Sequence, residues 1–229
     1  MASAKSKIKQ SEMTRKKHLQ LIKPKTKNAE RALKKQRQLV RGALKVFTTK
    51  GFHASSLREI AEASQMSLGS IYDYIEKKED ILYLVHNEIM DQIFNQLKES
   101  IERYEDPIKN FDKILFDLFS LSRQLHDEVK VIFSETKSLD KEYRKHILAR
   151  ESAYVSVIEA IITDGVKKGA FECTEPALMA NIITHLGAIM PLRGWNIMPR
   201  NSAEDVHHEI VQLIFTRLKS KADLDLKHM

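Results

Sequence analysis

The stretch LREIAEASQMSLGSIYDYI, residues 57–75, predicts a short helix, a turn and a second short helix. Three apolar residues of its first part recur at the i, i+3, i+4 spacing of one buried helix face: Leu57, Ile60 and Ala61. Ser56 stands just before this run and Glu59 follows it by three residues, the spacing of a capping box that satisfies free backbone N–H groups. We therefore expect one helix from about Ser56 to Ser64.

The second helix is expected at residues 68–74, after a turn at Gln65 and Met66 and a cap at Ser67. About two turns of helix are too short to be stable alone, so this helix must pack on its neighbours. We expect Gly69 and Ile71 to face inward. The residues expected to face outward are Ser67, Leu68, Ser70, Tyr72 and Tyr74.

These residues belong to a longer pattern. The run IAEASQMSLGSIYDYIEKKEDIL, residues 60–82, with Phe47, Gly51 and Phe52 upstream, resembles the DNA-binding domain of the tetracycline-repressor (TetR) family of bacterial transcription regulators. The resemblance covers about residues 39–84 and is only architectural beyond them. It implies that the second short helix enters the major groove of DNA, with its N-terminal residues near the base edges.

The resemblance implies a set of DNA contacts, in which Lys78 at the start of the next helix donates to a phosphate. The residues that we expect to contact DNA are Ser56, Arg58, Gln65, Ser67, Leu68, Ser70, Tyr72, Tyr74 and Lys78. Three residues depart from the family pattern: Gln65 replaces a common turn glycine, Ile75 an aromatic residue, and Lys77 a Ser or Asn that usually caps the next helix. These departures predict a turn that is tighter in φ and a helix that is less well capped.

Composition indicates an all-α protein that can bury a core. The chain has 229 residues and is 42% hydrophobic, yet it holds only 7 Gly and 5 Pro and shows no alternating run of β-branched residues. With the resemblance, this predicts an N-terminal three-helix helix-turn-helix domain joined by a long helix to a C-terminal helical domain for ligand binding and dimerisation. A single cysteine, Cys173, excludes an internal disulfide framework.

Positive charge is concentrated at the N-terminal end. Residues 1–50 hold sixteen Lys or Arg against Glu12 and Glu30, whereas the whole chain has a net charge of +7, so the remaining residues are net negative. This asymmetry is what attraction to phosphates at one end of a molecule requires.

Residues 1–27 are polar, contain Pro24 and show no helical apolar stripe, so we expect a basic mobile arm rather than a folded element. Two interpretations remain open: a solvated tail without a role, or an arm that contacts phosphates or the minor groove beside the operator. The parts expected to follow are the helix-turn-helix domain at 28–76, the helical regulatory and dimerisation domain at 77–222, and a tail at 223–229.

Helical apolar stripes recur throughout the chain. We expect helices at about 29–50, 78–103, 108–125, 126–138, 141–168, 175–195 and 203–219. By the resemblance, the helix at 78–103 joins the DNA domain to the regulatory body, and an effector that repacks it would separate two reading heads. The last two helices would pair with their copies as a four-helix bundle, so we expect a homodimer on a palindromic operator. The interface residues expected are Leu178, Ile182, Leu186, Ile189, Ile210 and Ile214.

Large, adaptable side chains in the C-terminal part suggest a pocket for a small, largely apolar effector, for which aromatic, long-chain or acyl-thioester compounds are candidates. The alternative is that these side chains are ordinary core. The expected pocket residues are Phe116, Phe119, Phe133, Tyr154, His185, Met190 and Trp195.

We find no motif that indicates an enzyme, a cofactor or a metal site. His207, His208 and Glu209 are consecutive, so they point to different sides of a helix, unlike a metal-binding pair at i, i+4. No apolar stretch reaches the ~18 residues of a membrane span, so we expect a cytoplasmic, nucleoid-associated protein. The function expected is a ligand-responsive dimeric transcriptional regulator, most simply a repressor. The alternative is an effector-independent DNA-binding protein whose C-terminal domain only dimerises or recruits a partner protein.

Overall fold

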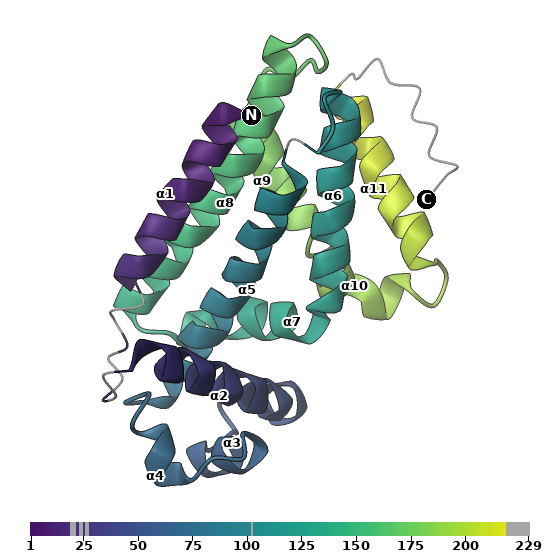
Figure 1. The fold of residues 1–229 in the computed structure, drawn as a ribbon. Coiled ribbons are helices and arrows are strands. Elements are labelled where there is room, and N and C mark those ends of the chain that lie inside the picture. Colours follow the sequence, from purple (N-terminus) through teal and green to yellow (C-terminus); the bar gives the residue numbers. More distant parts are fainter. Residues whose placement is uncertain (19–21, 23–24, 26–27, 102, 219–229) are drawn as a thin grey trace. The chain divides into compact units, whose positions relative to one another are not determined.

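The computed structural model describes residues 1–18, 22, 25, 28–101 and 103–218 (Figure 1). Every regular element in these residues is helical, so the predicted all-α class is confirmed. The helices are α1 (Ala2–His18), α2 (Ala29–Lys50), α3 (Leu57–Ala63), α4 (Leu68–Ile71), α5 (Lys78–Ser100), α6 (Pro107–Gln124), α7 (His126–Glu135), α8 (Lys141–Lys167), α9 (Pro176–Leu186), α10 (Ile189–Ile197) and α11 (Ala203–Arg217). Within this part of the chain, none of them has both the length and the apolar character needed to cross a bilayer.

Internal contacts divide the chain into two units, which we call the head unit and the body unit. The head unit comprises Ser11–Gln92 and Leu125–Glu151. The body unit comprises Met1–Gln10, Ile93–Gln124 and Ser152–Met229. This division does not follow the domain limits predicted at residues 27, 76 and 222, and those limits stay predictions.

The core of the head unit forms where α2 packs against α3 and α7. One face of α2 carries the buried residues Leu39, Ala43 and Phe47. The ring of Phe47 meets that of Phe52 edge to face, with ring centroids 5.3 Å apart. Gly51 ends α2 with φ 78°, as a glycine at this position permits.

The carboxylate of Asp80 closes the turn before α5. It accepts hydrogen bonds from the backbone N–H groups of Glu76 at 2.7 Å and Lys77 at 3.2 Å. It also accepts one from the Tyr143 hydroxyl of α8, at 2.7 Å. Asp80 thus supplies the cap that Lys77 cannot, and the Lys77 ammonium instead donates to Asp140 at 2.7 Å.

Arg150 is the largest fully buried side chain of the head unit, with 2% of its surface exposed. Its guanidinium donates to the Asn87 side-chain oxygen at 2.7 Å and to the Asp91 carboxylate at 2.8 Å. A buried charge must be paired to be tolerated, so these bonds tie α8 to α5 inside the head unit.

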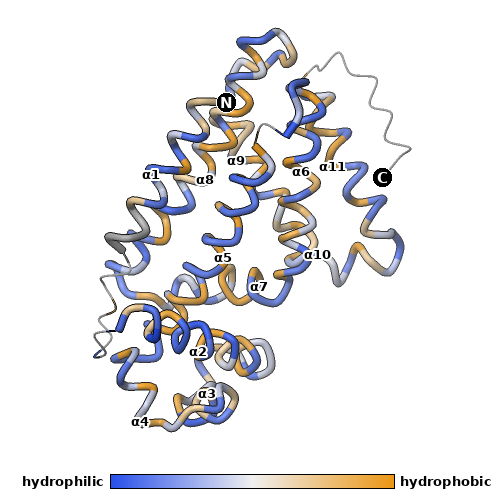
Figure 2. The backbone as a smooth tube through the Cα atoms, viewed as in Figure 1, coloured by the Kyte–Doolittle hydropathy of each residue, from blue (hydrophilic) through white to orange (hydrophobic). Residues whose placement is uncertain are grey.

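The body unit has a core of three phenylalanines from α6, the turn after α8, and α11. Phe111 lies with its ring centroid 5.5 Å from that of Phe171 and 5.9 Å from that of Phe215. Figure 2 shows hydrophobic and hydrophilic residues alternating in short blocks along α6, whose inward side is buried. This is the pattern of a helix that covers a core with one side only.

The expectation of no folded element before residue 28 is wrong for residues 2–18, which form α1. Ala4 and Ile8 of this helix are buried. Within the body unit, the Met1 ammonium lies 2.9 Å from the Asp164 carboxylate of α8, beside which α1 runs in Figure 1. The apolar stripe of α1 is too narrow to stand out in the sequence, although the fold buries it.

The single helix expected at 175–195 is also wrong, because α9 ends at Leu186 and α10 begins at Ile189. Pro191 explains the break. A proline has no N–H to donate to the carbonyl four residues earlier, here Gly187, and its ring clashes with that carbonyl in a continuous helix. In the first turn of α10 the same proline is tolerated.

Candidate nucleic-acid interface and ligand cavity

The C-terminal end of α3 lies directly on α2. A Cβ built on Gly42 would stand 2.6 Å from the backbone nitrogen and 2.7 Å from the Cα of Ser64, so only a glycine fits there. The Gln38 side chain of α2 donates to the Ser64 carbonyl at 2.7 Å. These contacts fix where the turn between α3 and α4 begins.

The predicted capping box at the start of α3 is confirmed. The Ser56 hydroxyl accepts from the Glu59 N–H at 3.2 Å, and the Glu59 carboxylate accepts from the Ser56 N–H at 2.8 Å. The Lys50 ammonium also donates to Glu59. The hydrogen bonds that the Glu59 carboxylate accepts from the Lys50 ammonium, the Ser56 hydroxyl and the Ser56 N–H lower its pKa to about 2, with the bond from Lys50 contributing most. Ser56 is exposed, but its hydroxyl already serves the cap.

The turn between α3 and α4 contains a residue in the left-handed region. Gln65 has φ 53°, where family members commonly have glycine. An L-residue in this conformation brings its Cβ close to the following carbonyl oxygen, which costs roughly 1–2 kcal/mol. The tight turn expected from the sequence is therefore present, and it is strained.

Gln65→Gly is expected to raise the free energy of unfolding by about 1 kcal/mol. Glycine removes the Cβ clash, and its greater freedom in the unfolded chain offsets only part of that gain. Urea denaturation followed by circular dichroism measures the effect. The matched control is Gln96→Gly inside α5, which should destabilise instead; a loss of stability in both variants would contradict strain at Gln65.

The inward side of α4 differs from the one expected. Ile71, Tyr74 and Ile75 are at most 4% exposed and follow the i, i+3, i+4 spacing of one face. The expectation that Tyr74 faces outward is therefore wrong. The expectation that Gly69 packs inward is also wrong, because it is exposed and a Cβ there would meet nothing within 4 Å.

The opposite side of this segment forms what we call the reading face. The reading face consists of the exposed or half-exposed residues of α3, of the turn and of the segment 68–72. They are Arg58, Gln65, Ser67, Leu68, Gly69, Ser70 and Tyr72. The Ser67 hydroxyl caps α4 by accepting from the Ser70 N–H at 3.1 Å. Six of the nine predicted DNA-contacting residues thus lie on one short, outward-facing segment.

The Lys78 ammonium is engaged within the head unit. It donates to the carbonyls of Phe52, Ser55 and His53 at 2.7, 2.8 and 3.3 Å, and it lies 4.5 Å from the centre of the Phe52 ring. A phosphate would compete with these three acceptors. The phosphate contact expected of Lys78 stays a prediction.

A part of the N-terminal segment is attached beside α4. The N–H of Lys25 donates to the carbonyl of Asp73 at 2.8 Å, next to Tyr72 of the reading face. Ile22 is buried, whereas Lys25 is exposed. This contact supports the interpretation in which the basic segment contacts DNA over the one in which it is a solvated tail. Lys23 and Lys27 lie outside the described residues.

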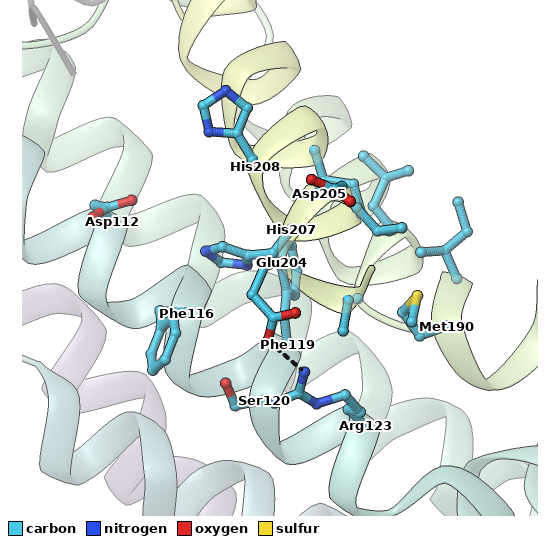
Figure 3. A pocket seen from close by; sticks show the side chains of 16 residues that line it. Asp112, Phe116, Phe119, Ser120, Arg123, Met190, Glu204, Asp205, His207 and His208 are labelled. Carbon is cyan, nitrogen blue, oxygen red and sulfur yellow. Dashed lines mark ion pairs between the residues drawn. The ribbon is translucent and has the colours of Figure 1, made fainter. Parts of the chain in front are cut away.

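The body unit contains a cavity of about 780 Å³ between α6, the start of α10 and α11 (Figure 3). Most of its wall is apolar. The residues that line it are Asp112, Phe116, Phe119, Ser120, Arg123, Leu186, Gly187, Ile189, Met190, Ala203, Glu204, Asp205, Val206, His207, His208 and Ile210. A volume of this size is within the range of small-molecule sites in proteins, about 300–1,000 Å³.

Two polar groups in this wall are perturbed by burial. One carboxylate oxygen of Asp112 is buried without a hydrogen-bond partner in the described structure, and burial raises the pKa of this carboxyl. Burial, and then the charge of Arg123, lowers the pKa of His207. Its ring stands edge to face against Phe116 and Phe119, with centroid distances of 5.4 and 5.8 Å.

The structure brings together only part of the expected effector pocket. Phe116, Phe119 and Met190 line the cavity. Four expected residues do not: Phe133, which belongs to the head unit, and Tyr154, His185 and Trp195. Trp195 is 70% exposed. Tyr154 of α8 is in a buried environment, and burial raises the pKa of its hydroxyl. Asp112 was missed, although its spacing of four residues from Phe116 places both on one side of α6.

The six residues expected at the dimer interface fall into three groups: exposed, lining the cavity, and buried. Leu178 and Ile182 of α9 are 60% and 46% exposed, as an uncovered interface requires. Leu186 and Ile189 are half-buried and line the cavity. Ile210 and Ile214 are buried inside the body unit, so their placement at an interface is wrong. The exposed apolar residue of α11 is instead Leu213, at 63%, which lies off the buried stripe.

Two family models match this chain. Residues 39–83 match "Bacterial regulatory proteins, tetR family", and residues 105–217 match "Tetracyclin repressor-like, C-terminal domain". Together they cover more than half of the chain, and the first coincides with the segment on which the resemblance rests.

Individual relatives agree in fold. The chain is 27% identical over 135 residues to a fatty acid metabolism regulator protein of Bacillus subtilis, covering 59% of this chain and 70% of that protein. It is similar to AibR in complex with isovaleryl coenzyme A and operator DNA, with 21% identity, a TM-score of 0.66, and 81% and 99% of the two chains covered. It is also similar to FadR from Bacillus subtilis in complex with stearoyl-CoA, with 21% identity, a TM-score of 0.66, and 79% and 98% covered. The chain therefore belongs to the TetR family of bacterial transcription regulators.

Proposed function

We propose that the protein is a dimeric, ligand-responsive repressor that binds a palindromic operator and is released by an acyl thioester. The observation that carries the proposal is the reading face, which sits on a buried base of Ile71, Tyr74 and Ile75. A major groove about 12 Å wide admits one such helix. The exposed Lys25, whose N–H donates to the Asp73 carbonyl, adds positive charge beside this face.

The reading face has few side chains that form paired hydrogen bonds with bases. Arg58 and Gln65 are the residues for direct base contacts, and Leu68 suits the methyl group of thymine. Tyr72, which is 42% exposed, and Ser67 suit phosphate oxygens. Selectivity then depends on a small number of contacts repeated by two-fold symmetry and on DNA shape.

Dimerisation supplies that symmetry. We assign the interface to α9 and α11, with Leu178, Ile182 and Leu213 as its exposed apolar residues. A two-fold axis between these helices would set two reading faces one turn of DNA apart or slightly more, roughly 34–36 Å.

The effector class follows from the cavity and the relatives together. The cavity wall is mostly apolar, with a few placed polar groups, as a site for an acyl chain requires. Two structural neighbours are complexes with acyl derivatives of coenzyme A. Both points argue against the effector-independent alternative, in which the body would only dimerise or recruit a partner.

Selection of bound sequences from a random DNA pool at stated salt tests the DNA-binding part. We expect an enriched palindrome with half-sites 10 to 11 base pairs apart, roughly one helical turn. Fluorescence anisotropy of the selected operator then tests release by acyl-CoA compounds of increasing chain length. No enriched sequence would overturn the regulator, and an enriched palindrome with no release by any acyl-CoA would favour the alternative.

A regulator that binds an operator must be located with the chromosomal DNA. We therefore propose a cytoplasmic, nucleoid-associated location and a role without catalysis.

A further inference from the structure

One wall of the cavity carries an acid without a counter-charge. Asp112 projects from α6, and one of its oxygens is buried without a hydrogen-bond partner. The nearest lysine in sequence, Lys113, is bound by Asp117 and lies over the ring of Phe116. A buried polar group without a partner costs free energy, so a ligand group that bonds to Asp112 would recover that cost.

The second polar group, His207, comes from α11. Its ring is fixed between Phe116 and Phe119, and burial favours the neutral ring. A neutral imidazole carries one N–H donor and one acceptor nitrogen. Asp112 and His207 both line the cavity, and Figure 3 shows them with Phe116 on the same side of it.

The other charged groups of the wall are already paired. The Arg123 guanidinium lies 3.7 Å from the Glu204 carboxylate, and both are exposed. Asp205 accepts from the N–H and the hydroxyl of Ser202 in the cap of α11. The wall thus holds three carboxyl groups against one guanidinium, which is unfavourable for an anionic ligand group inside the cavity.

We propose that Asp112 and His207 bind an uncharged carbonyl of the effector, such as that of a thioester, and that the cavity rejects the corresponding carboxylate. This inference rests on the proposed function and specifies the chemistry of the same site. In its neutral form, which burial favours, Asp112 donates to the carbonyl oxygen; in its ionised form it repels a carboxylate. The neutral form binds the carbonyl of a thioester, whereas a carboxylate ligand beside Asp112 is disfavoured because it brings a second acid of like charge to the same place.

The test uses one acyl chain with different head groups. The chain length is the one whose acyl-CoA releases the operator best. The full-length protein is titrated by calorimetry with four ligands of that length: the N-acetylcysteamine thioester, the methyl ester, the carboxylate and the alkylammonium. Using N-acetylcysteamine keeps the thioester and removes the phosphates of coenzyme A. We expect the two uncharged ligands to bind tighter than the carboxylate by about tenfold or more, because the acid must be buried beside Asp112.

Three variants identify the residue responsible. Asp112→Asn keeps the size and a hydrogen-bond donor, so thioester binding should stay within about threefold while the preference over the carboxylate falls. Asp112→Leu removes hydrogen bonding, and thioester affinity should fall by about tenfold. The control is Glu99→Gln, which removes an exposed acid of α5 outside the cavity and should leave the preference unchanged. Thermal melts confirm that each variant is folded.

The outcomes separate this inference from the proposed function. If the carboxylate or the alkylammonium binds as tightly as the thioester, the inference is wrong although the effector class stands. An unchanged preference in Asp112→Asn would also overturn it. If no acyl-CoA releases the operator and none of the four ligands binds, the effector class is wrong and the inference falls with it.

Discussion

Replacing Arg150 by methionine is expected to lower the free energy of unfolding of the head unit by about 3–5 kcal/mol. The substitution keeps much of the volume but removes the guanidinium that donates to the Asp91 carboxylate and to the Asn87 side-chain oxygen. Removing one partner of a buried ion pair has effects of this size because the other charge stays buried. Urea denaturation followed by circular dichroism gives the value.

Two further variants make the Arg150 result specific. Lys145→Met removes the same charge from an exposed site of α8 and should change stability by no more than about 0.5 kcal/mol. Adding Asp91→Leu to Arg150→Met also removes the carboxylate that the Arg150 guanidinium bound, and should recover part of the loss. Equal effects of Arg150→Met and Lys145→Met would contradict a buried ion pair.

The second large effect is expected from Gly42→Ala. The added Cβ would stand under 3 Å from backbone atoms of Ser64, so α3 must move away from α2. We expect a loss of about 1–3 kcal/mol of stability, the range for overpacked cores. Operator affinity should fall by about tenfold or more, because the turn that presents α4 shifts with α3. Denaturation and operator anisotropy measure the two effects.

Gly69→Ala is the matched stability control for Gly42→Ala. It adds the same methyl group in α4, where nothing lies within 4 Å. Alanine also favours helix over glycine by about 0.5–1 kcal/mol, so stability should stay or rise. If Gly42→Ala proved as stable as Gly69→Ala, the close contact between α2 and α3 would be refuted.

The parts of the fold that follow from local rules were predictable from the sequence. The Ser56–Glu59 capping box, the end of α2 at Gly51 and the start of α6 at Pro107 each depend on residues within four positions. Such signals are complete in the sequence because both partners lie in the same turn of helix.

Several errors arose where a partner lies far away in sequence. Ala4 and Ile8 give no visible stripe in the sequence, yet both are buried in the fold. Nothing near Asp112 in sequence indicates that one of its oxygens is buried. Tyr74 and Gly69 are a different case. Three and four residues after Ile71 are Tyr74 and Ile75, which form the buried face with it, and Gly69 lies off that face, so a count along the helix gives the correct assignment.

The shared carboxylate of Asp80 has a spectroscopic consequence. Two backbone N–H groups of the turn before α5 and the Tyr143 hydroxyl of α8 all donate to the Asp80 carboxylate. If Tyr143 moves away, Asp80 is less well held and the amides of Glu76 and Lys77 become easier to open. Their hydrogen–deuterium exchange rates would then rise together, so two backbone amides act as a natural reporter of the state of α8 in the head unit.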